Sequence, residues 1–128
     1  VKAMAKKENF SAELKTGSIL KIPYGDGMFD CVVAMSVLEH MTDLDKSISE
    51  VARVASDKAD IILGFPVANF ITDSLFRILG YDPREIHPSG HNSIIGTIKK
   101  YLNIKEIIRH PAFVPLNLSL YVVLRCGK

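Results

Sequence analysis

The stretch IPYGDGMFDCVVAMSVLEHM, from Ile22 to Met41, decides the fold. Residues 23–27 are proline, tyrosine, glycine and aspartate, a composition that favours a tight turn. The apolar run Phe29–Val37 follows the turn and is continuous rather than alternating. Such a run is typical of a strand that is covered on both faces, as in a parallel sheet between helices. We therefore expect a buried strand that carries polar groups to its carboxyl end.

A helix and a second strand follow this stretch. Thr42 offers a side-chain cap, and apolar residues then recur at helical spacing over residues 44–55. The same spacing predicts that Lys46, Glu50 and Arg53 face outward. The apolar run Asp60–Phe65 predicts a second buried strand, which Pro66 ends. The order strand, helix, strand indicates a right-handed crossover and an α/β fold.

The other expected elements are shorter or less regular. Apolar spacing, turn residues and capping residues delimit them. They are a helix over residues 1–9, a strand over Ala12–Thr16 that ends at Gly17-Ser18, a helix over Asn69–Leu79 that buries Ile71, Leu75, Ile78 and Leu79, a loop over Tyr81–His91 that could form a lid, a helix from Asn92 or Ser93, and an antiparallel pair of strands over Ile104–His110 and Leu116–Arg125.

Composition narrows the functional class. The 128 residues predict one domain, and a net charge of +2 is too small to indicate a nucleic-acid partner. We expect no membrane partner, because no apolar stretch has the length of a bilayer span. The histidines His87 and His91 lack further ligands at suitable spacing, so no metal site is predicted. Cys31 and Cys126 show no disulfide pattern, which favours a reduced, cytoplasmic location.

The ordered set of motifs resembles a known family. Gly17-Ser18, Ile22-Pro23-Tyr24, Asp26, Phe29-Asp30 and Leu38-Glu39-His40 follow one another as in class I S-adenosylmethionine-dependent methyltransferases, in the small-molecule branch called type 11. The resemblance implies a Rossmann-like, three-layer α/β sandwich. Its sheet would be mostly parallel, with an antiparallel C-terminal hairpin. It also implies S-adenosylmethionine as cofactor and methyl transfer to a small-molecule acceptor.

Two departures from the family pattern stand out. The family's glycine-rich turn between a strand and a helix, and the acidic residue that ends the next strand, have no counterpart here. They are therefore expected before Val1. Residues 1–128 would then form one methyltransferase-like domain that is truncated at its N-terminus. Ser18 also stands where the family has an aspartate, and serine is the weaker hydrogen-bond acceptor. We therefore expect this chain alone to show weak or no activity.

The resemblance assigns candidate site residues. Those that would contact the cofactor are Gly17, Ser18, Ile19, Met35, Ser36 and Glu39. His40 is the candidate catalytic base, because imidazole exchanges protons near neutral pH. Each has a simpler alternative: a strand-ending turn for Gly17-Ser18, core packing for Met35, and fixing of the loop before the next helix for Glu39 and His40. Asp26 and Asp30 are expected to be structural, in a turn and at a strand start.

The missing strands also have a physical consequence. Without the family's first strand, the strand over residues 29–36 would expose an apolar edge, and such edges pair with other chains. The chain would then either move Ala12–Thr16 inward or form a homodimer through this edge. The alternative function is therefore a non-catalytic, methyltransferase-like interaction domain that pairs through an exposed sheet edge.

Overall fold

The computed structural model describes residues 7, 11, 13–82 and 88–128. Its elements run in the order β1 (Phe29–Met35), the 3-10 turn η1 (Leu38–His40), α2 (Leu44–Val54), β2 (Ala55–Pro66), α3 (Phe70–Ile78), α5 (His91–Tyr101), β3 (Asn103–His110), the 3-10 turn η2 (Leu116–Leu118) and β4 (Tyr121–Gly127). The predicted helix over residues 1–9 lies outside the described residues, apart from Lys7. The predicted strand Ala12–Thr16 is wrong, because residues 13–16 belong to no strand.

The four strands form one sheet in the order β1-β2-β4-β3. The pair β1 and β2 is parallel, whereas β4 runs antiparallel to both β2 and β3. The sheet is therefore mixed. The α/β class and the antiparallel C-terminal hairpin that the sequence predicted are confirmed.

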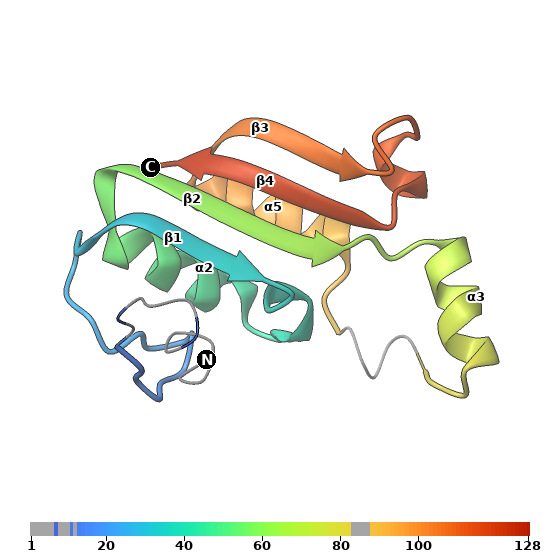
Figure 1. Ribbon diagram of the computed structural model, residues 1–128, viewed down its shortest axis with the longest axis horizontal. Coiled ribbons are helices and arrows are strands. Elements are labelled where there is room, and N and C mark those ends of the chain that lie inside the picture. The colour runs from blue at the N-terminus through green and yellow to red at the C-terminus, as the bar shows by residue number, and fades with distance from the viewer. Residues whose placement is uncertain (1–6, 8–10, 12, 83–87) are drawn as a thin grey trace.

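Helices α2 and α5 cover one face of this sheet, behind it in Figure 1. The core lies between these helices and the inward side chains of β2 and β4. Its fully buried members include Ile48, Ile61, Leu63, Phe65, Ile94, Ile98, Val122 and Leu124. Burial of each such side chain contributes roughly 1.5–3 kcal/mol. No described helix covers the opposite face, so the second helical layer of a three-layer sandwich is not among the described residues.

Several element boundaries differ from the predicted ones. Helix α2 is capped by Asp43 instead of Thr42, because the Asp43 carboxylate accepts the Lys46 N–H at 2.9 Å. Helix α5 begins at His91 after the N-cap Gly90. Strand β4 begins at Tyr121, since residues 116–118 form η2.

Helix α3 projects away from the sheet in Figure 1. The side-chain amide of Asn69 ties its start to the Ser119 carbonyl at 2.7 Å, while the rest of the helix extends outward. As a result Ile78 is 82% exposed and Leu79 is 61% exposed. The prediction that these two residues are buried is wrong, because helical periodicity does not show whether a core lies within reach.

Candidate functional site

The chain turns sharply at Ser36, directly after β1. Its φ of 53° is a left-handed conformation that is uncommon for residues other than glycine. The Ser36 N–H donates to the Gly64 carbonyl at 2.8 Å and so anchors the turn to β2. Strained backbone of this kind gathers at functional sites, and open α/β sheets bind ligands at the carboxyl ends of their strands. The turn places the Ser36 hydroxyl at that edge.

The partner of Ser36 is Tyr121, a residue that the sequence analysis did not single out. The two hydroxyl oxygens lie 2.9 Å apart and share one hydrogen bond. Tyr121 opens β4, and β2 separates that strand from β1. The contact joins residues 85 positions apart in the chain, so no local pattern could have revealed it.

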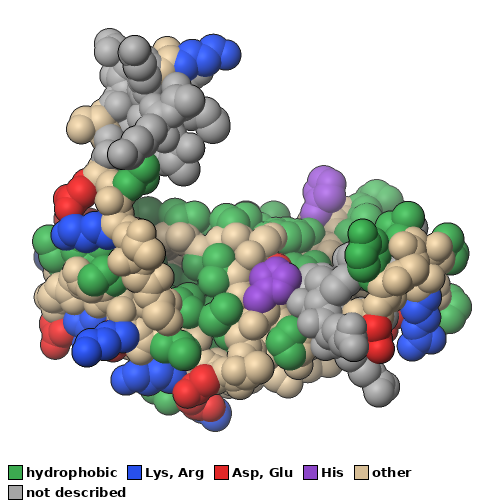
Figure 2. Space-filling model, turned by 90° about the horizontal axis from the view of Figure 1, so that it is seen from below, with side chains coloured by type: hydrophobic (Ala, Val, Ile, Leu, Met, Phe, Trp, Pro, Cys, Tyr) green, Lys and Arg blue, Asp and Glu red, His purple; other side chains and the backbone are tan. Residues whose placement is uncertain are grey.

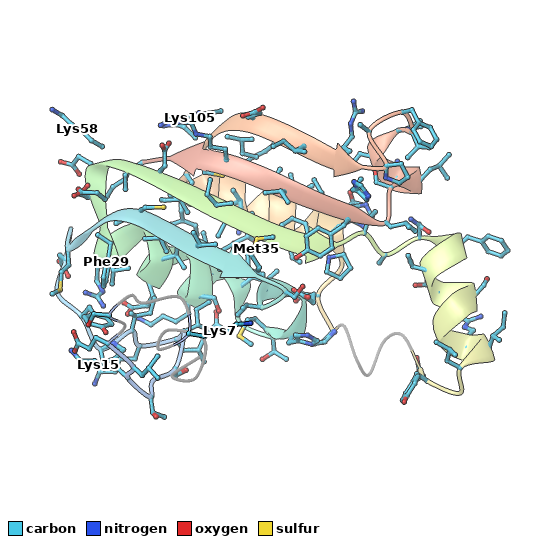
Figure 3. All side chains as sticks on the ribbon, viewed as in Figure 1. Lys7, Lys15, Phe29, Met35, Lys58 and Lys105 are labelled. Atoms are coloured by element: carbon cyan, nitrogen blue, oxygen red, sulfur yellow. The ribbon has the colours of Figure 1, made fainter. Side chains whose placement is uncertain are left out.

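Gly64 makes this arrangement possible. A Cβ atom at Gly64 would lie 2.5 Å from Met35 Cε and 3.0 Å from Tyr121 Cε1. Met35 and Tyr121 therefore both lie against the bare backbone of β2, and Met35 is on the face without described helices (Figure 3). A single glycine inside a predicted strand indicates close approach of another group, and that signal was available in the sequence.

A cleft of about 560 Å³ lies beside the carboxyl half of β1. Its volume is in the range of small-molecule sites. Four of the predicted cofactor residues line it, namely Gly17, Ser18, Ile19 and Met35. Figure 2 shows hydrophobic and histidine side chains in the middle of this side of the molecule, with charged side chains towards its ends. The structure thus brings together residues that lie on both sides of the turn over residues 23–27.

Gly17 has a steric role at the cleft. A Cβ atom there would lie 2.8 Å from Pro23 Cδ, so a larger residue would push the two segments apart. Ser18 forms a local turn, in which its hydroxyl accepts the Leu20 N–H at 3.2 Å and its carbonyl accepts the Lys21 N–H at 3.0 Å. The residues form a turn, but no strand precedes it among residues 13–16, so it is not the strand-ending turn of the simpler alternative. The predicted contact of Gly17 and Ser18 with a cofactor stays a prediction.

Glu13, Lys15 and Tyr24 also line the cleft. The Lys15 ammonium lies 4.3 Å from the centre of the Tyr24 ring, and it also pairs with Glu13 at 2.9 Å. Tyr24 meets Phe29 edge to face, with ring centres 4.9 Å apart. Figure 3 labels Lys15 and Phe29 on this side of the molecule. Tyr24 is therefore a further wall residue, which the sequence analysis noted only as part of the motif.

His40 lies at a second hollow. This hollow has a volume of about 580 Å³ and shares Gly17, Ser18 and Ile19 with the cleft. The His40 side chain is 46% exposed, and its Nε2 lies 3.8 Å from Glu39 Oε1. The imidazole is open to solvent at the rim, which is where a base would have to be to receive a proton from a bound acceptor. Its catalytic role stays a prediction.

Glu39 does not line either hollow. Its side chain is only 3% exposed, and its Oε2 has no hydrogen-bond partner among the described residues. The backbone carbonyl of Glu39 accepts the Ser89 N–H at 3.2 Å, so Ser89 lies against the Glu39 backbone. A buried carboxylate oxygen without a partner is costly. Its predicted contact with a cofactor is not seen in the lining of the cleft and stays a prediction.

Arg53 connects the turn over residues 23–27 to α2. Its guanidinium donates to the carbonyls of Ile22 and Tyr24, at 3.0 and 2.9 Å, and to the Asp26 carboxylate at 2.7 Å. The predicted outward position of Glu50 is wrong: Glu50 is 7% exposed, because its carboxylate accepts the Ile22 N–H at 2.9 Å.

These contacts shift the pKa values of both charged groups. The hydrogen bond from Arg53 lowers the pKa of Glu50 to about 2, and the backbone N–H of Ile22 lowers it further in the same direction. The Glu50 and Asp26 carboxylates raise the pKa of Arg53. Both aspartates bond side chains of the fold, Asp26 the Arg53 guanidinium and Asp30 the Ser56 hydroxyl at 2.9 Å. A backbone N–H was expected as the partner of Asp30.

Within residues 7, 11, 13–82 and 88–128, no three His, Cys, Asp or Glu side chains are grouped so as to hold a metal ion. None of the helices in that part of the chain is long and apolar enough to cross a membrane.

The sequence matches known methyltransferases. Residues 1–63 match the family described as "Methyltransferase domain". Norajmaline N-methyltransferase of Rauvolfia serpentina is 33% identical over 91 residues, which cover 71% of this chain and 25% of that protein. Ajmaline N-methyltransferase of the same plant is 45% identical over 47 residues, which cover 37% of this chain and 16% of that protein. The chain thus spans a quarter or less of these relatives.

The fold matches solved structures. The PH0226 protein of Pyrococcus horikoshii OT3 superposes with a TM-score of 0.72 at 18% identity, over 99% of this chain and 65% of that chain. A geranyl diphosphate methyltransferase solved in complex with SAM superposes with a TM-score of 0.70 at 11% identity, over 98% of this chain and 62% of that chain. At these identities the likeness establishes the fold.

Proposed function

The chain belongs to the methyltransferase-domain family, and from this premise we propose that the protein transfers a methyl group from S-adenosylmethionine to a small-molecule acceptor. The observation that carries the proposal is the cleft beside β1, where Gly17, Ser18, Ile19 and Met35 meet. In this proposal, residues 1–128 form one methyltransferase-like domain.

The cleft fits part of the cofactor. Ile19 offers apolar surface to an adenine ring, and the Ser18 hydroxyl can accept a hydrogen bond from its amino group. S-adenosylmethionine supplies an electrophilic methyl group on a sulfonium sulfur. The protein's contribution is to hold the acceptor in line with that group, and this positioning provides most of the rate enhancement. His40, at the adjoining hollow, receives the proton that the acceptor releases.

Cofactor binding by this chain should be weak. Glu13 and Lys15 are the charged residues that line the cleft, and they pair with each other. Among the described residues, the lining therefore leaves no free carboxylate for the ribose hydroxyls. Glu39 is a buried carboxylate four residues after Met35, and its Oε2 has no hydrogen-bond partner among the described residues. It does not line the cleft.

The test is a titration of the chain with S-adenosylhomocysteine, followed by the methyl resonances of ¹³C-labelled methionine. We expect weak binding that shifts the Met35 signal, and the variant Ile19→Asp should abolish the shift. Ile108→Asp is the matched control, since Ile108 is an exposed isoleucine on β3, away from the cleft. Absence of any Met35 shift, or equal binding by Ile19→Asp, would overturn the proposed site. Micromolar affinity would contradict the expectation that this chain lacks part of the pocket.

A specific observation also favours the second candidate, a non-catalytic interaction domain that pairs through β1. The two edge strands of the sheet are β1 and β3. Edge strand β3 carries Lys105, Glu106 and Arg109, which discourage pairing with another chain. Strand β1 carries one charged residue, Asp30, and its Val33 is 60% exposed. This asymmetry supports a homodimer through the edge of β1.

The oligomeric state distinguishes this candidate. Size-exclusion chromatography with light scattering should give twice the monomer mass, and Val33→Lys should convert the dimer to a monomer. Ile108→Lys places the same charge on the other edge strand and should leave the dimer intact. A monomer for the unaltered chain at all concentrations would exclude the homodimer.

We also propose a cytoplasmic location. Cys31 and Cys126 are both free thiols, which suits a reducing compartment. A fluorescent fusion imaged in cells, beside a secreted marker, tests this directly. Fluorescence in a secretory compartment would contradict it.

A further inference from the structure

The uncovered face of the sheet changes character along its length. Cross-strand pairing places Met35, Gly64, Val123 and Ile108 in one row across all four strands. Tyr121 lies two residues from Val123 on the same face. At the other end of this face, Arg125 donates to Asp60 at 2.9 Å in an ion pair. The apolar and hydroxyl-bearing end is therefore the carboxyl end of β1 and β2, where α/β sheets bind ligands.

The Ser36–Tyr121 pair has unused hydrogen-bonding capacity. Two hydroxyl groups carry two donors and four lone pairs, and the bond between them uses one of each. Ser36 is exposed and Tyr121 is half-buried, so a bound molecule can reach the remaining lone pairs. The pair is uncharged, and it adjoins the apolar surface of Met35 over Gly64.

We propose that the Ser36 and Tyr121 hydroxyls form the subsite that binds the methyl acceptor, an uncharged O–H or N–H group on an apolar or aromatic body. The body lies over Met35 and Gly64, and the O–H or N–H donates to a lone pair of the hydroxyl pair. This contact turns the acceptor's own lone pair away from the sheet, towards the methyl donor. The subsite rests on the proposed function, since it assigns one partner of that reaction.

The subsite also separates substrate from product. After transfer, the acceptor oxygen carries the methyl group in place of its proton, which passes to His40, so the product can no longer donate to Ser36 or Tyr121. The methylated product therefore loses a hydrogen bond that the substrate makes. Loss of one such bond corresponds to about a two- to tenfold weaker affinity.

A pair of small probes tests the subsite in this chain. p-Cresol carries a phenolic O–H, and 4-methylanisole is the same molecule with that oxygen methylated. Both are titrated against the chain with ¹³C-methyl methionine, with the Met35 signal as the reporter. We expect p-cresol to shift this signal and to bind about two- to tenfold more tightly than 4-methylanisole.

The variants isolate the hydroxyl pair. Tyr121→Phe keeps the ring, and Ser36→Gly suits the φ of 53°, so the double variant removes both hydroxyls with little strain. The preference for p-cresol over 4-methylanisole should disappear in the double variant. It should persist in the control Tyr101→Phe, because the Tyr101 hydroxyl bonds Asp45 on the helical side of the sheet. The two single variants serve as a check on folding, through the dispersion of their methyl signals.

The outcomes are distinct. Equal preference in the unaltered chain and in the double variant, or shifts confined to other methionines, overturn the subsite. The titration with S-adenosylhomocysteine is scored separately, by the loss of the Met35 shift in Ile19→Asp. Probe binding without cofactor binding refutes the proposed function and leaves a small-molecule subsite, whereas cofactor binding without probe discrimination refutes the subsite alone.

Discussion

Arg53 and Glu50 form a two-point ion pair one turn apart on α2, with Nε and Nη2 of Arg53 donating to the two Glu50 oxygens at 2.7 and 2.8 Å. The pair is the junction between the helix and the turn that precedes β1. Glu50 holds the N–H of Ile22, and Arg53 holds its carbonyl. The turn that begins the decisive stretch is therefore fixed by side chains from a helix that follows it in the chain.

Replacement of Arg53 by methionine should lower the thermal unfolding midpoint by several degrees. The methionine keeps the apolar stem but loses the bonds to the Ile22 and Tyr24 carbonyls and to Asp26. Circular dichroism during heating measures the change. Lys46→Met, an exposed cation on the same helix, is the control and should unfold close to the unaltered chain. Equal unfolding midpoints for both variants would show that the Arg53 bonds to the turn do not stabilise the fold.

Acid should destabilise the fold through Glu50. Its pKa is about 2 in the folded state, against an ordinary value of 4.5. A carboxylate with a lowered folded pKa contributes its stabilisation above its unfolded pKa and loses it as the pH falls. Urea unfolding should therefore show stability falling between pH 4.5 and 2. The variant Glu50→Gln should flatten that part of the curve, and an unchanged slope in this variant would contradict the assignment.

Gly64→Ala should destabilise the chain by about 1–3 kcal/mol, the usual cost of overpacking. The new methyl group would meet Met35 and Tyr121 at 3.0 Å or less. Denaturant unfolding measures the change, and the added substitution Met35→Ala should recover part of it. Gly25→Ala, where a Cβ meets nothing within 4 Å, is the control. A neutral Gly64→Ala would show that Met35 does not rest on β2.

Glu39→Met should leave stability unchanged or raise it while weakening the binding of S-adenosylhomocysteine. A buried carboxylate with one oxygen unpartnered is a cost that an apolar side chain of similar shape removes. Residues kept at such a cost are often kept for function. Unfolding and titration on the same sample give both quantities. Unaltered cofactor affinity would show that Glu39 has no part in the site.

The two thiols should differ in reactivity. Cys31 is exposed on β1, whereas Cys126 is buried and burial raises its pKa to about 11. A thiol reagent at pH 8 should modify Cys31 rapidly and Cys126 only after unfolding, as mass spectrometry can show. If the chain dimerises through β1, Cys31 should become protected as the concentration rises. Rapid modification of both thiols in the folded chain would contradict the core position of Cys126.

The elements near the decisive stretch were predictable because their signals are local. The apolar run of β1, the helical spacing of α2 and the terminal hairpin each follow from residues a few positions apart. The prediction of a strand at residues 12–16 was wrong because a strand of that kind depends on a non-local partner. A short alternating pattern forms a strand only beside a partner strand, and no described strand pairs there.

The candidate site was predictable in part. Gly17, Ser18, Ile19 and Met35 line one cleft, and their contact with a cofactor stays a prediction. Tyr121 and the buried position of Glu50 were not predictable, since each depends on a partner far along the chain.

The sequence by itself determined which segments are strand, turn or helix around residues 22–66, and which family they resemble, because periodicity and turn chemistry act over a few residues. Only the tertiary structure decided which side chains meet: Ser36 with Tyr121, and Arg53 with the turn that precedes it. It also showed that the helices described cover one face of the sheet, leaving Met35 and Val33 exposed on the other. Such contacts depend on how the strands are ordered in the sheet, and strand order is a property of the whole fold.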